Sequence, residues 1–232
     1  PPANFREWMS VPEEDVVHVV HGQIWREDSG AFAAVRNAFE PHWPERVRLR
    51  RIAHWCRVAS GMGTYALQRA LLRDDPFYAA TRFGYALRCS LQLAFLIDRV
   101  YFPYDKWLVA FVPRLSSMRA AIETLLEAVF AQAATMGDRL AALEGFADAV
   151  DAELVHQRVI EPHSRMHRSP TSGYRLLEHA YAEILKRMTP EEAVAVPVQD
   201  QIHLEAFHSG YVRGVDREEW LGLLGLEYRS EQ

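Results

Sequence analysis

The sequence predicts an all-α fold, a bundle of about six to nine helices with little or no sheet. Apolar residues recur at helical spacing along most of the chain, whereas the alternation typical of strands is scarce. Prolines and glycines stand mainly between these periodic segments. Only residues 23–25 and 194–198 are weak strand candidates. With 232 residues, of which 49% are hydrophobic, the chain is long enough to bury a substantial core.

The first helix is expected to begin after Ser10, whose side chain would cap it, and to end at Gly22. A connector with the turn Asp28-Ser29-Gly30 leads to a short helix over residues 30–40. Pro41 and Pro44 break the chain, and a long helix begins at about Glu45. Its inward-facing positions are expected to be Val47, Ile52, Trp55, Cys56 and Ala59. Its arginines are expected to spread over the rest of its surface, at positions 46, 48, 50, 51 and 57.

The middle of the chain contains the most apolar segment. A kink is expected at Gly61-Met62-Gly63, followed by a helix over residues 65–73. The sequence Asp74-Asp75-Pro76 predicts the end of that helix and the start of the next, because acidic residues and an early proline favour a helix N-terminus. The helix over residues 76–100 is the most apolar, and we expect it to lie at the centre of the bundle.

The rest of the chain is also expected to be helical. Residues 107–115 form a short helix or turn, and Ser116 or Ser117 caps a helix that reaches about Met136. Further helices are expected over residues 137–160, 174–188, 199–210 and 217–225, with a short helix from Thr189. The polar loop over residues 162–173 is the one plausible boundary. The predicted organisation is a bundle over residues 1–161 and a C-terminal helical extension over 162–232 that packs on it.

Composition narrows the class of protein. The net charge of −5 argues against a general nucleic-acid surface. Cys56 and Cys89 both fall in apolar helical patterns, which indicates small buried hydrophobes in a reducing, cytoplasmic environment. The longest apolar tract, residues 83–97, is too short to cross a membrane. Because the chain begins with Pro1 rather than Met, we expect a fragment or a product whose start was removed.

Two groups of cations are candidates for binding a phosphate. Lys106, one of two lysines in the chain, stands in the aromatic segment 101–107 beside Tyr104. Its compact charge suits a phosphate, although its stem could equally lie across the rings with the ammonium group in water. Arg69 and Arg73 are four residues apart on one helix face, which suits either a solvated surface or a site opposite an anion.

Other patterns are weaker indications of a metal site or a catalytic site. Glu153-x-x-His156 and Glu205-x-x-His208 match the helical pattern of di-iron carboxylate bundles, but about one such match is expected by chance in a chain with this many glutamates and histidines. His163 and His167 lack a nearby acidic ligand. Arg158 and His163 have the spacing of nuclease-type HEPN helical domains, but Pro162 interrupts the helix between them. No glycine-rich phosphate loop or nucleophile elbow is present.

Several separate motifs resemble one known family. They occur in the same order along the chain, at residues 8–14, 22–32, 43–44, 48–53, 65–73 and 101–107. Together they resemble a bacterial helical domain of unknown function that follows minimal nucleotidyltransferase domains. That domain is related to the C-terminal helical bundle of antibiotic nucleotidyltransferases. The resemblance covers roughly residues 5–115. It departs from the family at Gly61-Met62-Gly63-Thr64-Tyr65, where the family tends to carry Gly-Gln-Tyr-Asn, and at Arg73-Asp74-Asp75, where it tends to carry Arg-Gly-Asp.

The resemblance implies a substrate- and nucleotide-binding helical domain whose catalytic strand domain lies outside these residues. By this analogy Lys106 would reach a nucleotide phosphate, Arg69 and Arg73 would be secondary contacts, and Tyr104 would belong to the same site. No cofactor is expected in this chain alone, and a nucleoside triphosphate with Mg²⁺ would bind only with the missing domain. The partners would be a nucleotide and a small hydroxyl-bearing acceptor. A non-catalytic binding or dimerisation module and a di-iron carboxylate bundle remain the alternatives.

Overall fold

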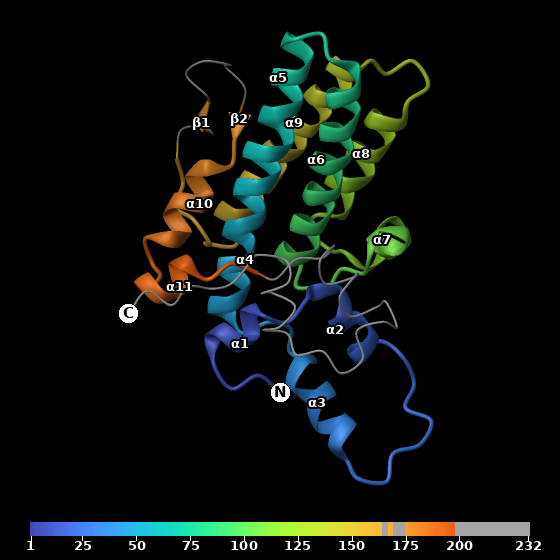
Figure 1. Cartoon of the computed structure of the whole chain (residues 1–232), viewed down its shortest axis with the longest axis vertical. Coiled ribbons are helices and arrows are strands. Elements are labelled where there is room, and N and C mark those ends of the chain that lie inside the picture. The colour runs from blue at the N-terminus through green and yellow to red at the C-terminus, as the bar shows by residue number, and fades with distance from the viewer. Residues whose placement is uncertain (164–166, 169–174, 198–232) are drawn as a thin grey trace, which may run out of the picture. The chain divides into compact units, whose positions relative to one another are not determined.

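Helix α6 (Pro76–Ile97) is the central element of the computed structural model, which describes residues 1–163, 167–168 and 175–197 (Figure 1). It packs against α4 (Glu45–Arg57), α5 (Ala66–Leu72), α8 (Arg119–Phe130) and α9 (Met136–His156). Residues 89–97 are all buried, because helices or loops cover every side of this half of the helix. The predicted central role of this segment is confirmed, and so is the all-α fold.

Helices α4 and α5 are joined without a break by the π-helix η1 (Val58–Tyr65), which occupies the position of the predicted kink. The resulting rod runs beside α6, to which it is connected by a short turn (Figure 1). Gly63 permits their close approach, because a Cβ atom there would lie only 3.0 Å from the Cβ atom of Ala86 on α6. The inward-facing positions predicted for the long helix are all buried.

Three of the predicted surface arginines are buried instead. Arg48, Arg50 and Arg51 are 1%, 4% and 0% exposed. Each has acceptors from a distant part of the chain: Arg48 donates to the Leu96 carbonyl, Arg50 to the Ala193 carbonyl and Arg51 to the Glu13 carboxylate. The expectation of a solvated arginine surface was therefore wrong for these positions, since the bundle supplies acceptors to each guanidinium group. Only Nη1 of Arg50 and Nε of Arg51 are buried without an acceptor among the described atoms of these three groups.

The N-terminal helices α1 (Phe5–Met9), α2 (Glu13–Val20) and α3 (Ala31–Phe39) lie at one end of the rod (Figure 1). Ser10 is not the cap of α2, as predicted, but ends α1, where its hydroxyl donates to the Glu7 carbonyl. Edge-to-face contacts among Trp8, Phe39 and Trp43 fix α1 against α3, with ring centroids 5.0–6.1 Å apart. The weak strand candidate at residues 23–25 is a loop.

After α6, the chain forms α7 (Asp105–Phe111) and the 3₁₀-helix η2 (Val112–Arg114) before the α8–α9 hairpin. Neither Ser116 nor Ser117 caps α8. Instead, the Asp98 carboxylate at the end of α6 accepts the backbone N–H groups of Ser116 and Met118. Helix α8 also ends earlier than predicted, at Phe130, because Thr135 and Asp138 form a capping box that starts α9.

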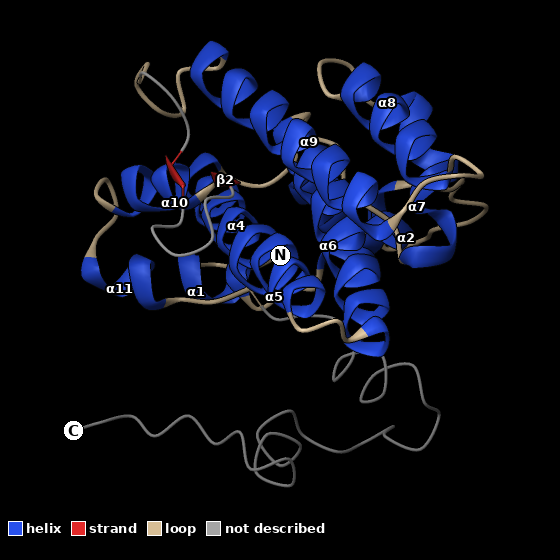
Figure 2. Ribbon diagram, turned by 90° about the horizontal axis from the view of Figure 1, so that it is seen from above, coloured by secondary structure: helices blue, strands red, loops and turns tan. Residues whose placement is uncertain are grey.

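The C-terminal described segment begins with two short antiparallel strands, β1 (His167–Arg168) and β2 (Arg175–Leu176), in which His167 pairs with Leu176. Helix α10 (Glu178–Leu185) packs on α4, and α11 (Pro190–Val194) starts at a Thr189 capping box. Seen from above, α10 and α11 lie at one side of the bundle and α7 and α8 at the other (Figure 2).

The helix predicted from residue 174 thus starts later, and residues 194–197 form no strand. The helices predicted over residues 199–210 and 217–225 lie outside the described residues. No helix in the described ranges combines the length and apolar character needed to cross a membrane.

Candidate functional site

Three arginine side chains, Arg69, Arg73 and Arg82, line one surface pocket with a volume of about 360 Å³. We call it the three-arginine pocket. Arg69 lies on α5, Arg73 caps the C-terminal end of α5, and Arg82 lies near the start of α6. The rest of the lining comes from Gly61, Met62, Tyr65, Ala66 and Tyr78. The pocket therefore lies where the π-helix, α5 and α6 meet.

The arginines of this pocket have no carboxylate partner within the described part of the chain. The guanidinium group of Arg82 contacts the Tyr78 and Tyr85 rings, with its carbon 5.3 and 5.1 Å from their centroids. Its Nε atom is buried without a hydrogen-bond acceptor among the same residues. A buried N–H group without an acceptor is costly, so the pocket favours an anion that would supply one.

Arg88, about two turns further along α6, differs from the pocket arginines because it has carboxylate partners. It pairs with Glu14 at 3.2 Å and with Asp105 at 2.6 Å. Of the two aspartates that follow Arg73, Asp75 caps α6, because its carboxylate accepts the Tyr78 N–H. Within the described residues, neither Asp74 nor Asp75 forms an ion pair with an arginine of the pocket.

The aromatic lysine segment forms a different surface. The ammonium nitrogen of Lys106 lies 5.0 Å from the centroid of the Tyr104 ring and 6.0 Å from that of Trp107. The His18 imidazole stacks against Tyr104 with the ring centroids 5.7 Å apart. Hydrogen bonding from Lys106, and secondarily from Trp107, lowers the pKa of the Tyr104 hydroxyl. Lys106 forms no ion pair with any residue in the described ranges.

The structure separates the predicted site residues into two groups. Arg69 and Arg73 share a pocket, whereas Lys106 and Tyr104 do not line it. The ion pair between Arg88 and Asp105 places the start of α7 beside the second half of α6, away from the pocket near the first turns. Sequence reasoning missed Arg82, because it lies on another helix. The spacing of Tyr78 and Arg82, four residues apart, was the one available signal, since it places both on one face of α6.

The metal-binding patterns receive no support within the described ranges, where no group of three His, Cys, Asp or Glu side chains is placed to hold a metal. Glu153 accepts a hydrogen bond from Gln157. His163 lies 2.9 Å from the Asp151 carboxylate and does not share a helix with Arg158, because α9 ends at His156. Glu205, His208 and the side chain of His167 lie outside the residues described.

Comparison with known families places the two candidate surfaces in one segment. Residues 8–108 match a family described as "Domain of unknown function (DUF4037)". The matched segment contains the three-arginine pocket and extends to the first turn of α7, where Lys106 lies. No curated protein and no solved structure matches the chain. The match to this family thus covers residues 8–108, which is less than half of the chain.

Proposed function

We propose that this chain is the helical nucleotide-binding part of a nucleotidyltransferase-like protein, and that the three-arginine pocket holds nucleotide phosphates. The observation that carries the proposal is the meeting of Arg69, Arg73 and Arg82 at one pocket without a carboxylate partner in the described residues. Guanidinium groups are planar forks that match phosphate oxygens with two parallel hydrogen bonds. A pocket of about 360 Å³ falls within the range of small-ligand sites.

The chemistry of nucleotidyl transfer needs more than this pocket supplies. The reaction requires two or more carboxylates that hold Mg²⁺. It also requires a bound acceptor whose hydroxyl group receives the nucleotidyl group. In the proposed arrangement a strand domain outside these residues holds Mg²⁺ and carries out the transfer, whereas this chain binds the nucleoside triphosphate and a small hydroxyl-bearing acceptor. The protein would act in the cytoplasm, which agrees with the burial of Cys56 and Cys89 as small apolar side chains.

Calorimetric titration of the purified chain with tripolyphosphate, Mg-ATP and Mg-CTP tests the proposal. Arg69→Ala, Arg73→Ala and Arg82→Ala should each weaken binding by about 10- to 100-fold, the loss expected for one charge-assisted contact. Arg119→Ala is the matched control, because that arginine is half exposed on α8 and its one ion pair among the described residues is with Glu123 in the same helix. Absence of binding by the natural chain, or an equal loss in the control, would reject the phosphate role.

Lys106, on a surface separate from the three-arginine pocket, is a second proposed phosphate contact. Replacing it with alanine should abolish the binding of Mg-ATP while leaving the melting temperature within about 3 °C, because an exposed lysine contributes little to stability. Differential scanning calorimetry measures the second quantity. Unchanged affinity in Lys106→Ala together with a loss in Arg73→Ala would restrict phosphate binding to the three-arginine pocket.

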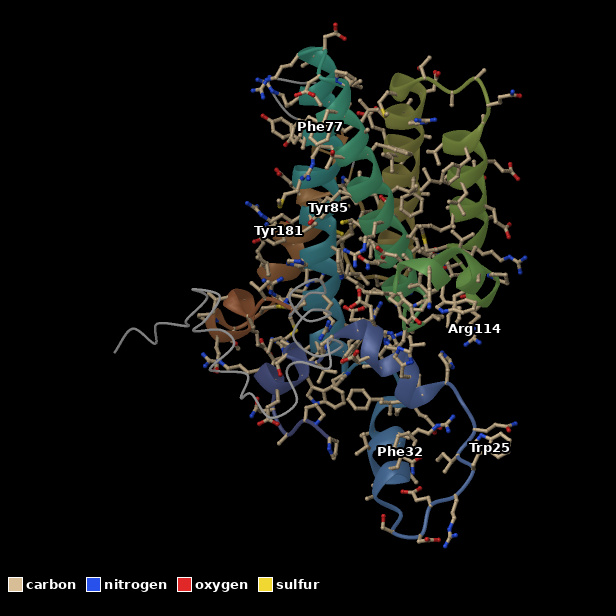
Figure 3. The ribbon with its side chains drawn as sticks, turned by 45° about the vertical axis from the view of Figure 1, so that its right-hand side comes forward. Trp25, Phe32, Phe77, Tyr85, Arg114 and Tyr181 are labelled. Carbon is tan, nitrogen blue, oxygen red and sulfur yellow. The ribbon has the colours of Figure 1, made fainter. Side chains whose placement is uncertain are left out.

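A non-catalytic dimerisation module is the second candidate, and it is favoured by apolar side chains at the same end of the molecule. Met62, Leu72 and Phe77 are 55%, 66% and 82% exposed, and Phe77 lies in the first turn of α6 (Figure 3). Burying such a group against a second copy would remove it from water. Light scattering should show a dimer that Phe77→Ser dissociates, whereas a monomer at all concentrations would exclude this role.

A further inference from the structure

A second pocket, with a volume of about 380 Å³, lies between α2, the connector of residues 21–30 and α3. Its rings come from three elements: His18 from α2, Trp25 from the connector and Phe32 from α3 (Figure 3). We call it the aromatic pocket. None of its lining residues belongs to the three-arginine pocket, so a ligand of the aromatic pocket is independent of the proposed function.

The rings of the aromatic pocket are unusually open to solvent. Trp25 is 94% exposed and Phe32 is 44% exposed, and the apolar side chain of Ile24, which also lines the pocket, is 40% exposed. Tryptophan normally buries most of its large apolar surface, and its exposure next to other apolar groups marks a contact surface. Because these side chains line a pocket rather than a flat face, the contact expected here is with a small molecule.

The charged groups around this pocket are used to hold the connector in place. Arg36 donates to the backbone carbonyls of Val20 and Gly22 at 2.7 and 2.9 Å. The Glu27 carboxylate accepts the backbone N–H of Ala33 at 3.0 Å and caps α3. Arg26 pairs with Asp28 at 3.0 Å. The connector is therefore anchored by its polar side chains, while the rings remain available to a ligand.

The imidazole of His21 is a further ring in the lining of the aromatic pocket. Arg114 Nη1 lies 3.0 and 3.1 Å from its two ring nitrogens, and the edge of the Phe111 ring lies against it with the centroids 5.7 Å apart. Burial, followed by the charges of Arg114 and Arg36, lowers the pKa of His21, which disfavours the charged form of the ring. The other imidazole, His18, is held by its stacking on Tyr104. The pocket thus offers the flat, polarisable surfaces of two imidazoles beside Trp25 and Phe32.

We infer that the aromatic pocket binds a planar heteroaromatic ring, such as a nucleobase, with Trp25 and Phe32 stacking against it. Stacking of a base on an aromatic side chain gives useful affinity without a charged partner, which suits a pocket whose charged side chains already hold the connector. Binding would cover Trp25, the most exposed large apolar side chain among the described residues.

The test uses the complete chain and ring compounds that carry no phosphate: adenosine, cytidine and indole, titrated by calorimetry. At least one should bind, and Trp25→Ala and Phe32→Ala should each weaken its binding by about tenfold or more. Phe130→Ala is the matched control, because that ring is 66% exposed at the end of α8 and outside the pocket. Arg73→Ala should leave the affinity for the same compound unchanged.

Three results would overturn the inference. The first is that none of the three compounds binds at millimolar concentration. The second is that binding survives in both Trp25→Ala and Phe32→Ala, which would place the ring elsewhere. The third is an equal loss in Phe130→Ala, which would indicate non-specific stacking. The melting temperature of each variant should match that of the natural chain, since both rings are exposed and contribute little to the fold.

Discussion

Arg51 and Glu13 form an ion pair whose side chains are 0% and 3% exposed, with the Nη1 and Oε1 atoms 2.8 Å apart. The pair joins the middle of α4 to the first residue of α2. The second guanidinium nitrogen donates to the backbone carbonyls of Trp8 and Val11, and the group lies over the Trp43 ring at 4.0 Å. Burial raises the pKa of Glu13 and lowers that of Arg51, while their mutual attraction opposes both changes. One arginine thus connects three N-terminal segments to the bundle.

Replacing Arg51 with methionine should lower the free energy of unfolding by about 3–5 kcal/mol, because it leaves the Glu13 carboxylate buried without its partner. Urea denaturation followed by circular dichroism measures the change. Arg119→Met, on the exposed surface of α8, should cost less than about 1 kcal/mol. Similar losses in the two variants would mean that the buried pair contributes no more than a surface pair.

Gly63→Ala should destabilise the fold by about 1–3 kcal/mol, because the added methyl group would lie 3.0 Å from the Ala86 Cβ atom and 3.1 Å from its Cα atom. Gly84→Ala on α6 is the control. A Cβ atom there meets nothing within 4 Å, so the better helix propensity of alanine should stabilise the protein by up to about 1 kcal/mol. Thermal melting should show a lower melting temperature for Gly63→Ala and a higher one for Gly84→Ala. Changes in the same direction in both variants would contradict the close approach of η1 and α6.

The helices of this chain were largely predictable because their signals are local. Apolar spacing correctly predicted the inward face of α4, and Asp74-Asp75-Pro76 correctly predicted the start of α6. The predicted end of α6 was three residues late, since Asp98 and Arg99 leave the helix and Arg99 has a φ of +57°. Element ends depend on caps from other parts of the chain, which local patterns do not contain.

The candidate sites were less predictable because they combine distant residues. Arg69 and Arg73 were candidates from their spacing, but Arg82 joins them only because α6 turns back beside α5. Arg48, Arg50 and Arg51 were expected on the surface, and only the folded bundle brings their acceptors Leu96, Ala193 and Glu13 to them. Side-chain partnerships of this kind are set by tertiary packing, so a single sequence does not reveal them.

Asp98→Ala should lower the free energy of unfolding by about 1–3 kcal/mol, because it removes the acceptor for two backbone N–H groups. Its carboxylate also accepts the Ser117 hydroxyl, so one side chain ties the end of α6 to the start of α8. Chemical denaturation measures the loss. Glu123→Ala, which removes only a surface pair on α8, should cost less than about 1 kcal/mol. A loss no larger than that of Glu123→Ala would show that α8 does not need this cap.

Stability should fall in mild acid because of His42. This side chain is 5% exposed, its ring lies 4.5 Å from that of Tyr101, and neither ring nitrogen has a hydrogen-bond partner among the described residues. Burial, followed by the charges of Arg48, Arg99 and Arg51, lowers its pKa from 6.5 to about 3. Between these values the unfolded chain binds a proton that the folded chain does not. The contribution of neutral His42 is therefore present above pH 6.5 and is lost as the pH falls, at up to about 1.4 kcal/mol per pH unit.

His42→Asn should remove this dependence without straining the backbone, because asparagine tolerates the φ of +72° found at this position. Between pH 7 and pH 5 the natural chain should lose about 2 kcal/mol more than the variant, since the other titrating groups are common to both and cancel. Urea denaturation at a series of pH values gives both curves. His156→Asn is the control, because that histidine is exposed at the end of α9 and should leave the curve of the natural chain unchanged. Parallel curves for the natural chain and His42→Asn would show that His42 is protonated equally in the folded and unfolded states.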